Sequence, residues 1–348
     1  MQITQPTLCI HINQAKNNLL EMKQKADEAN IKLRPHFKTH QSAEIGHLAQ
    51  TIGITSCTVS SIEMALYFAQ NGWDNITVAF PVNILEIERI NQLAQTIQLN
   101  LLVENNESIQ FLQENLKSNI AVWIKVDCGY GRTGVAIDNY STLQQLVQEI
   151  ENSSKLNFKG FLTHNGGTYK CRSKEEILEL HRLVIYKIAN LKAQFPNAKV
   201  SYGDTPSCSV ASSFDHIDEI RPGNFVYYDL MQHHIGSCSL NQIAATMKVP
   251  VVATHPERNA VVVYGGGVHF SKETFTFSDQ TIVFGLVKNI NNIPVREDIY
   301  LTQLSQEHGI LTMPDSLLDE VKLGDIVEII PVHSCLTANL MKHNTVYL

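Results

Sequence analysis

The sequence predicts an α/β chain in which a (β/α)8 TIM-type barrel is followed by a mostly antiparallel β domain. Over the first two-thirds of the chain, short apolar runs rich in β-branched residues alternate with segments of helical periodicity. Eight such runs are present, which is the number of strands that a closed α/β barrel requires. From about residue 240 the helical periodicity fades and alternating runs replace it. We therefore expect a barrel over residues 12–238 and a β domain over residues 239–348, with residues 1–11 packed against the β domain.

The barrel strands and their helices can be assigned in order. The segment 61–72 begins with Ser61 at a plausible N-cap and ends in Asn-Gly, and the segment 173–194 is the clearest amphipathic helix. A doubly wound sheet is the alternative, but it normally carries a glycine-rich phosphate turn after its first strand, and RPHFKTH is not one. The expected strands lie at about 33–38, 54–60, 75–80, 98–103, 120–127, 157–163, 198–202 and 217–221.

The β domain is indicated by alternating runs at 247–255, 259–267 and 324–333. Glycines at 265–267 and the Gly324-Asp325 pair are typical of the turns between such strands.

Composition narrows the functional class. The 348 residues are 44% hydrophobic, enough for a sizeable core, and the formal net charge of −7 argues against a nucleic-acid or anionic-membrane partner. No apolar run approaches the roughly 18 residues needed to span a bilayer, and the N-terminus does not resemble a signal peptide. The seven cysteines contain no CxxC pair, which favours a reducing compartment. We expect a cytoplasmic protein.

Reactive side chains follow the expected barrel strands. Because the functional site of a barrel lies at the carboxyl ends of its strands, these residues are predicted to converge on one rim. They are Lys38 after the first strand, Arg132 after the fifth, His164 and Tyr169 after the sixth, Thr205 and Ser207 in GDTPS after the seventh, and Gly223 and Asn224 in RPGN after the eighth.

Lys38 is central to the predicted chemistry. A desolvated lysine has a lowered pKa and a nucleophilic amine that forms a Schiff base, whereas an ordinary strand-end lysine keeps its ammonium in water. Backbone N–H groups and hydroxyls in the seventh and eighth loops are typical of a phosphate cradle, although such loops also serve as simple turns. A phosphate cradle together with a strand-end lysine favours pyridoxal 5′-phosphate as cofactor.

A second candidate site is PVHSC near the C-terminus. His333 and Cys335 are two residues apart, so on an extended segment both side chains would point to the same face. An imidazole and a thiolate form a suitable pair of ligands for Zn²⁺, and two protein ligands would leave positions open for chemistry. A buried cysteine beside a surface histidine is the alternative interpretation.

The ordered set of these motifs resembles the D-serine dehydratase/D-threonine aldolase family, whose members are alanine racemase-like, fold-type III pyridoxal phosphate enzymes. The similarity runs from about residue 5 to the C-terminus. It rests on RPHFKTHQSAEI (34–45), VDCGYGRTGV (126–135), THNGGTY (163–169), GDTPS (203–207), RPGNFVYYDLMQ (221–232), EHGIL (307–311) and PVHSCLTANL (331–340).

The resemblance implies specific roles. Lys38 would be the Schiff-base lysine, Arg132 would reach the cofactor or the substrate carboxylate, and His333 and Cys335 would hold zinc. It also implies a homodimer whose active sites lie between domains. The residues implied to contact the cofactor are Tyr169, Thr205, Arg221, Gly223 and Asn224, with the phosphate held mainly by Thr205, Gly223 and Asn224.

The implied reaction is the elimination of water from a β-hydroxy D-amino acid, such as D-serine to pyruvate and ammonia. Lys38 would remove the α-proton and the metal would act as a Lewis acid on the β-hydroxyl. A D-threonine aldolase is the alternative, with His164 as a candidate base, but aldolases of this family tend to have Asp where Cys335 stands. A racemase would need a second acid/base, and a pyridoxal phosphate carrier would generally lack the second domain.

Overall fold

The chain folds into two compact units, which the computed structural model describes over residues 2–295 and 299–348. The barrel unit comprises residues 19–38 and 42–223, and the β unit comprises residues up to 18, 39–41 and 224–348. The sequence placed this boundary at 238/239. Residues 224–238 lie with the β unit because their backbone bonds to it, as when the Met231 N–H donates to the Val332 carbonyl at 3.2 Å.

Eight parallel strands make the sheet of the barrel unit, in the order β2-β10-β9-β8-β6-β5-β4-β3, and β7 pairs with β6. The two ends of this order meet, since the Phe37 N–H donates to the Thr58 carbonyl at 2.8 Å. The predicted barrel is therefore confirmed and the doubly wound alternative is excluded. The strands are β2 (Lys32–Leu33), β3 (Cys57–Val59), β4 (Asn75–Pro81), β5 (Gln98–Val103), β6 (Ile120–Asp127), β7 (Val135–Ala136), β8 (Leu156–His164), β9 (Lys199–Gly203) and β10 (Glu219–Ile220).

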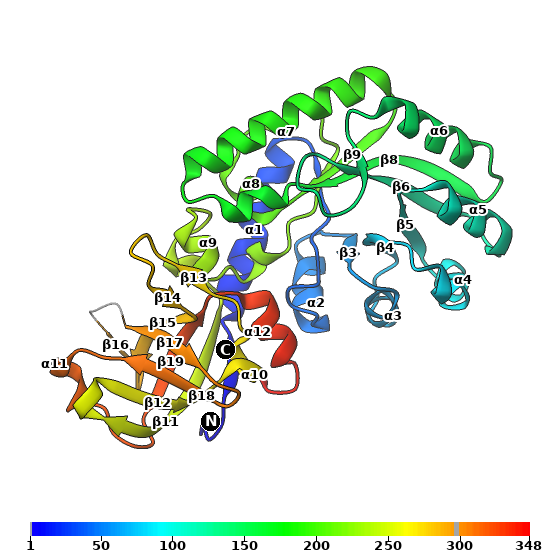
Figure 1. The fold of residues 1–348 in the computed structure, drawn as a ribbon. Coiled ribbons are helices and arrows are strands. Elements are labelled where there is room, and N and C mark those ends of the chain that lie inside the picture. Colours follow the sequence, from blue (N-terminus) through cyan, green and yellow to red (C-terminus); the bar gives the residue numbers. More distant parts are fainter. Residues whose placement is uncertain (1, 296–298) are drawn as a thin grey trace. The chain divides into compact units, whose positions relative to one another are not determined.

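Helices cover the outer face of this curled sheet, as Figure 1 shows for α3 to α7. Both helices predicted in detail are confirmed, and each begins after a serine whose hydroxyl accepts a backbone N–H: Ser61 from Met64 at 3.1 Å and Ser173 from Glu176 at 3.2 Å. The helices that belong to this unit wholly or in part are α1 (Ile12–Glu28), α2 (Ala43–Thr51), α3 (Ile62–Gln70), α4 (Ile87–Ala94), α5 (Asn106–Asn115), α6 (Tyr140–Glu151), α7 (Lys174–Gln194) and α8 (Thr205–Val210).

The interior of the barrel is layered. Leu102, Trp123 and Leu162 form a buried apolar cluster against which Ala79 packs. Because side chains alternate along a strand, residues two positions before and after this layer face the same interior, such as Asn100 before Leu102 and Lys125 after Trp123. The apolar layer therefore separates a polar end at the beginning of the strands from a polar end where the strands finish.

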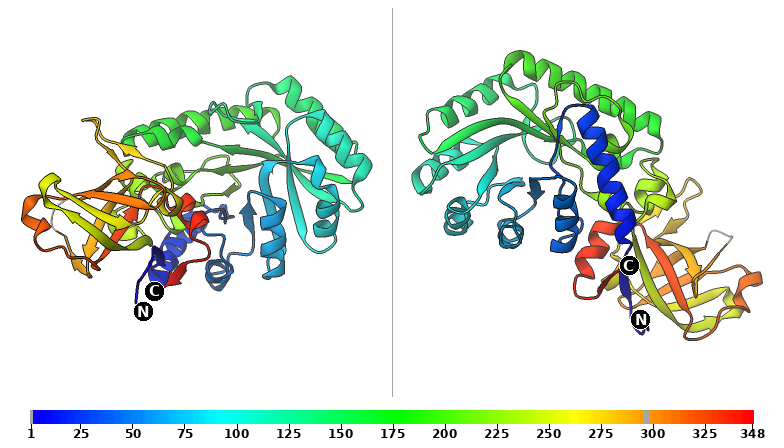
Figure 2. Two further views of the ribbon diagram at one scale, coloured as in Figure 1. Left: turned by 60° about the horizontal axis from the view of Figure 1, so that its bottom comes forward. Right: turned by 180° about the vertical axis from the view of Figure 1, so that it is seen from behind.

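The β unit contains an antiparallel barrel. Its sheet runs β12-β18-β17-β15-β19-β11-β1-β20, and an additional β12–β11 pairing closes the first six strands into a ring. β1 pairs antiparallel with β11 and parallel with β20, so the two termini lie side by side (Figure 2). The strands are β1 (Thr7–Ile10), β11 (Ala245–His255), β12 (Ala260–Tyr264), β13 (Phe275–Thr276), β14 (Ile282–Val283), β15 (Gly285–Ile290), β16 (Ile293–Pro294), β17 (Tyr300–Leu304), β18 (His308–Thr312), β19 (Ile326–Pro331) and β20 (Thr345–Tyr347).

Short helices connect these strands, and the predicted alternation at 247–255, 259–267 and 324–333 corresponds to β11, β12 and β19. The helices are α9 (Leu230–His234), α10 (Gly267–Phe270), α11 (Asp315–Leu318) and α12 (Ser334–Leu340).

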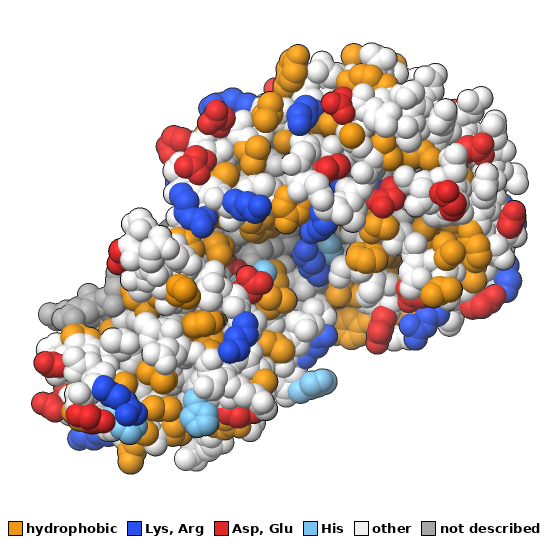
Figure 3. All heavy atoms as spheres, in the orientation of Figure 1, with side chains coloured by type: hydrophobic (Ala, Val, Ile, Leu, Met, Phe, Trp, Pro, Cys, Tyr) orange, Lys and Arg blue, Asp and Glu red, His pale blue; other side chains and the backbone are white. Residues whose placement is uncertain are grey.

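Acidic and basic side chains are interspersed over the surface, as one face in Figure 3 illustrates. None of the described helices combines the length and the apolar character that a membrane span requires.

Candidate active site

The predicted site residues of the barrel unit lie where its strands end. Lys38 follows β2, Arg132 follows β6, and His164 is the last residue of β8. Tyr169 lies in a short 3-10 helix after β8 (η2, Gly166–Lys170), Thr205 opens α8 directly after β9, and Arg221 and Gly223 follow β10. The parallel sheet brings all of these loops to the same end of the barrel, as predicted.

Lys38 differs from its neighbours in exposure. Residues 33–37 and 39–40 are buried, whereas Lys38 is exposed. Its backbone N–H donates to Nδ1 of His36 at 3.3 Å, which helps to fix the loop in which it lies. The sequence predicted that the Lys38 amine is desolvated. The protein alone does not desolvate it, because Lys38 lies on the rim beyond the strand and not between the strands.

His164 is held as a neutral ring. Burial lowers its pKa to about 3, and the positive charges of Arg132 and Lys38 act in the same direction. Its Nδ1 lies 2.7 Å from the Gly203 carbonyl, which can only accept, so Nδ1 carries the proton and Nε2 is an acceptor. A ring with so low a pKa is a weak base at neutral pH. This argues against the predicted role of His164 as a general base.

Arg132 lies on a loop organised by Asp127. The Asp127 carboxylate accepts the backbone N–H groups of Gly129, Tyr130 and Gly131 at 2.9 to 3.0 Å. The Arg132 guanidinium lies 5.4 Å from the centre of the Tyr130 ring, a cation–π distance. Tyr130 in turn meets the His164 ring edge-on at 5.8 Å. The positive charge of Arg132 thereby contributes to the lowered pKa of His164.

The loop between β9 and α8 packs closely against the loop after β10, and it contains the buried hydroxyl of Thr205. A Cβ on Gly203 would lie 3.0 Å from the carbonyl carbon of Arg221, so glycine lets β9 end against the β10 loop. The Thr205 side chain is fully buried, and its Oγ1 has no hydrogen-bond partner among the described residues. The Thr205 N–H donates to the Tyr169 hydroxyl at 3.3 Å, which joins two residues predicted to contact the cofactor.

Arg221 is a fixed internal cation. Its Nε donates to Ser201 Oγ at 2.5 Å and its Nη2 donates to the Thr163 carbonyl at 2.6 Å. Burial lowers its pKa to about 10, opposed by the negative charge of Glu219. The guanidinium therefore remains charged at neutral pH and its position is set by β8 and β9.

Sequence reasoning missed Lys125, a lysine in the apolar run IAVWIKVD. Its ammonium donates to the Val126 carbonyl at 2.8 Å. Burial lowers its pKa to about 8, helped by the positive charges of Arg221 and Arg132. A lysine within an otherwise apolar strand was the signal that could have identified it.

In the β unit, the side chains of His333 and Cys335 are hydrogen-bonded to each other. Burial opposes charge on both groups, but their hydrogen bond and mutual attraction raise the pKa of His333 to about 9 and lower that of Cys335. The imidazole therefore favours the deprotonated form of the Cys335 sulfur. No cluster of three or more His, Cys, Asp or Glu that could hold a metal occurs in the part of the chain that the structure describes.

His333 has an extended backbone but Cys335 lies in a helix, so the two do not share a face of one extended segment, and the reason given for their proximity was wrong. His333 caps α12 and Cys335 is the second residue of the helix. A cap residue and the first helical turn curl toward each other, which brings the imidazole to the sulfur. The helix N-terminus also favours the thiolate.

A polar network that the sequence did not reveal holds this pair. Asp229 Oδ2 accepts the amide of Asn224 at 2.5 Å and the backbone N–H of Ser334 at 3.0 Å. The Asn224 amide also lies 3.4 Å from Cys335 Sγ, and the Thr39 hydroxyl lies 3.2 Å from the same sulfur. Asn224, predicted as a phosphate contact, thus directs its amide at Asp229 and the thiolate. A role for its buried Oδ1 toward a cofactor stays a prediction.

Family comparisons agree with this architecture. The profile described as "Alanine racemase, N-terminal domain" matches residues 10–230, and that described as "Putative serine dehydratase domain" matches residues 244–347. The chain belongs to the alanine racemase N-terminal domain family. The added serine dehydratase domain confirms the predicted family, which is that of the D-serine dehydratase and D-threonine aldolase lyases. Pyridoxal phosphate is the cofactor expected of such fold-type III enzymes.

Curated relatives align with nearly the whole chain. A D-serine dehydratase from Dictyostelium discoideum is 28% identical, and the alignment covers 96% of this chain and 90% of that protein. A D-threo-3-hydroxyaspartate dehydratase from Delftia sp. (strain HT23) is 27% identical, with coverage of 95% and 91%. A D-threonine aldolase from Arthrobacter sp is 23% identical, with coverage of 97% and 88%.

Solved structures share the fold. The D-threo-3-hydroxyaspartate dehydratase from Delftia sp. HT23 superposes with a TM-score of 0.90 at 24% identity, covering 97% of this chain and 93% of that one. A cysteine-to-alanine variant of D-threo-3-hydroxyaspartate dehydratase in the metal-free form and a histidine-to-alanine variant give the same TM-score of 0.90.

The side chains fit both groups that the sequence predicted, pyridoxal phosphate and a divalent metal ion. In the barrel unit, the buried Thr205 hydroxyl without a partner and the close-packed Gly203 turn suit a phosphate monoester. In the β unit, an imidazole beside a thiolate suits a borderline-soft divalent ion such as Zn²⁺, and does not suit Mg²⁺.

Proposed function

We propose that this chain eliminates water from a β-hydroxy D-amino acid, with D-serine giving pyruvate and ammonia. The neighbouring side chains of His333 and Cys335 carry this proposal, because expulsion of hydroxide needs a Lewis acid, and an imidazole nitrogen with a thiolate sulfur has the donor chemistry for zinc. The names of two relatives, a D-serine dehydratase and a D-threo-3-hydroxyaspartate dehydratase, support the same reaction. The metal-free cysteine variant of the latter supports Cys335 as a ligand.

Pyridoxal phosphate, when bound, supplies an electron sink for the charge that develops at the α-carbon. Lys38 would hold the cofactor through its amine, and Thr205, Gly223 and Arg221 would anchor it in the barrel unit. A zinc ion, when bound, supplies Lewis acidity toward the β-hydroxyl.

Lys38, Arg132 and His164 would then have separate roles in the reaction. Once the substrate amine has replaced it on the cofactor, the freed Lys38 amine would take the proton from the α-carbon, and the Cβ–O bond would break as hydroxide leaves with a proton as water. Hydrolysis of the released enamine would then give pyruvate and ammonia. Arg132, with its guanidinium on the Asp127 loop, pairs with the substrate carboxylate. His164 stays neutral, with Nδ1 donating to the Gly203 carbonyl, so it adds no positive charge beside Arg132 and Lys38.

A D-threonine aldolase is the second candidate, favoured by the 23% identical relative of that name. It would need a base for the β-hydroxyl proton, and His164, with a pKa near 3, is ill suited to that task. The structural signal for the dehydratase is therefore the stronger one.

The deciding experiment is product analysis after incubation of the purified protein with D-serine and D-threonine, with and without a chelator. Chelator-sensitive formation of pyruvate from D-serine and of 2-oxobutanoate from D-threonine, each with ammonia, is expected. Glycine and acetaldehyde from D-threonine would instead establish the aldolase. If neither set of products forms while the pyridoxal absorbance is still present, both candidate functions are overturned. A racemase or a pyridoxal phosphate carrier would then remain. The homodimer and the cytoplasmic location stay predictions.

A further inference from the structure

A cavity of about 480 Å³ opens at the end of the barrel unit where the strands begin. Its lining residues come from the first positions of the strands, such as Lys32 of β2, Lys159 of β8 and Lys199 of β9. The catalytic candidates lie at the opposite ends of the same strands, beyond the layer of Leu102, Trp123 and Leu162. This cavity is therefore a separate place from the site described above.

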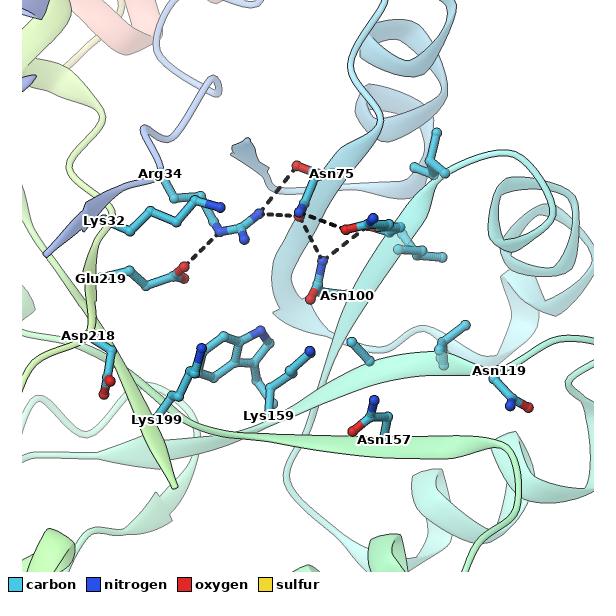
Figure 4. A pocket seen from close by; sticks show the side chains of 16 residues that line it. Lys32, Arg34, Asn75, Asn100, Asn119, Asn157, Lys159, Lys199, Asp218 and Glu219 are labelled. Atoms are coloured by element: carbon cyan, nitrogen blue, oxygen red, sulfur yellow. Dashed lines mark hydrogen bonds and ion pairs between the residues drawn. The ribbon is translucent and has the colours of Figure 1, made fainter. Parts of the chain in front are cut away.

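One wall of the cavity is a rigid polar network. Arg34 Nε donates to Glu219 Oε2 at 2.9 Å, and Arg34 Nη1 donates to Asn75 Oδ1 at 2.8 Å (Figure 4). Both acids in the lining are already engaged: Glu219 by Arg34 and by Ser201, and Asp218 by the Val200 N–H at 2.7 Å and by Lys192 at 3.5 Å. Glu219 also attracts the Lys32 ammonium, but neither carboxylate forms an ion pair with Lys32, Lys159 or Lys199 among the described residues.

Three lysines of the lining have no such partner. The ammonium groups of Lys32, Lys159 and Lys199 make no hydrogen bond or ion pair with any residue that the structure describes. Figure 4 shows their amino groups directed into the space enclosed by β2, β8 and β9. Burial, reinforced by the positive charge of Arg34, lowers the pKa of Lys32, which indicates that the cations repel one another. In a chain of net charge −7, this is a local concentration of positive charge.

The inner surface offers a further unpaired donor. Trp123 lines the cavity, is 3% exposed, and its indole Nε1 has no hydrogen-bond partner among the described residues. A buried N–H without an acceptor is unfavourable, so an acceptor supplied by a ligand would be stabilising. Asn100, also in the lining and buried, donates its amide nitrogen to the Ile76 and Gln98 carbonyls, each at 3.1 Å.

We propose that this cavity binds a small polyanion, a molecule that carries at least two phosphate or carboxylate groups. Three uncompensated ammonium groups around one space favour multiple negative charge, and charge-assisted hydrogen bonds are the strong ones. The volume lies in the range of small-molecule sites, about 300–1,000 Å³, and exceeds the needs of a single phosphate. Trp123 and Asn100 would meet the less charged part of the ligand.

The test is calorimetric titration of the cofactor-loaded protein with pyrophosphate and, separately, with citrate. Acetate serves as the monovalent control. Binding of pyrophosphate alone would assign the site to phosphate groups, binding of citrate alone to carboxylates, and binding of both to polyanions in general. Lys159→Gln and Lys199→Gln should each weaken binding about tenfold, and the double variant about a hundredfold, since each removes one charge-assisted contact.

The matched control is Lys174→Gln, which removes an exposed lysine in the first turn of α7, at the opposite end of the barrel. It should leave polyanion binding unchanged, and all four variants should keep the turnover of the parent protein. The proposal is overturned if the double variant binds as tightly as the parent. It is equally overturned if neither probe binds the parent below about 10 mM. Because the readout is binding, its failure is distinct from failure of the proposed lyase activity.

Discussion

The substitution Cys335→Ala separates metal chemistry from cofactor chemistry. It removes a sulfur that His333, Thr39 and Asn224 all contact, and leaves the barrel unit untouched. His333 then loses the anion that raises its pKa, so burial returns it toward the neutral imidazole. A single imidazole would remain as protein ligand at this place.

The size of the effect follows from the number of ligands. Structural zinc sites with four protein ligands bind with about 10–16 kcal/mol, so one ligand contributes about 3–4 kcal/mol. Loss of Cys335 should therefore weaken zinc binding by about 10² to 10³-fold. Thr39→Val removes only one hydrogen bond to the sulfur, which contributes about 1 kcal/mol, so it should weaken zinc binding by less than about tenfold.

The assay measures three quantities on one preparation: zinc content after dialysis, the absorbance of bound pyridoxal phosphate, and D-serine turnover. Cys335→Ala should lose zinc and turnover and keep the cofactor absorbance. Cys9→Ala is the matched cysteine control, because burial raises the pKa of Cys9 to about 11 and keeps it a thiol. Full zinc content in Cys335→Ala would refute the assignment of the ligand. Loss of the cofactor absorbance as well would refute the separation of roles.

Three further predictions concern the barrel unit. Thr205→Val should weaken pyridoxal phosphate binding about tenfold, as measured by titration of the apoprotein. The urea unfolding curve should stay unchanged. If the variant binds the cofactor with the affinity of the parent, Thr205 does not contact the phosphate. Burial raises the pKa of Asp204 from 3.8 to about 6, so the folded state holds the carboxyl proton more tightly than the unfolded state. The contribution of Asp204 to the free energy of unfolding is therefore lost as the pH rises from 3.8 through 6. The free energy of unfolding of the parent relative to Asp204→Asn should thus fall by about 2–3 kcal/mol across that window, and a rise would contradict the sign. Glu219→Gln should lower the free energy of unfolding by about 3–5 kcal/mol because it leaves the buried Arg34 charge unpaired, whereas the charge-free double variant Arg34→Met/Glu219→Leu should recover much of the loss.

Local patterns determined the elements of the barrel because each is specified by residues close in sequence. β-Branched runs bounded by turn residues marked all eight strands, and Ser61 and Ser173 marked the starts of α3 and α7 through caps that act within three residues. The convergence of Lys38, His164 and Thr205 at one end followed from the fold class itself, since parallel strands finish on the same side. Local reasoning failed at His333, where a helix cap and a helical turn replaced the expected extended segment, and it missed Lys125 within β6.

The environment of the site was decided by tertiary structure, because it joins residues far apart in the chain. Asp229 and Ser334 are 105 positions apart, and Thr39 and Cys335 are 296 apart, so no local pattern announces that they hydrogen-bond. The neutrality of His164 likewise depends on burial and on charges brought in from other loops. The sequence alone determined which elements form and which reactive side chains they carry, because those depend on neighbouring residues. The protonation state, partners and orientation of those side chains depend on what packs around them, and only the tertiary structure sets that.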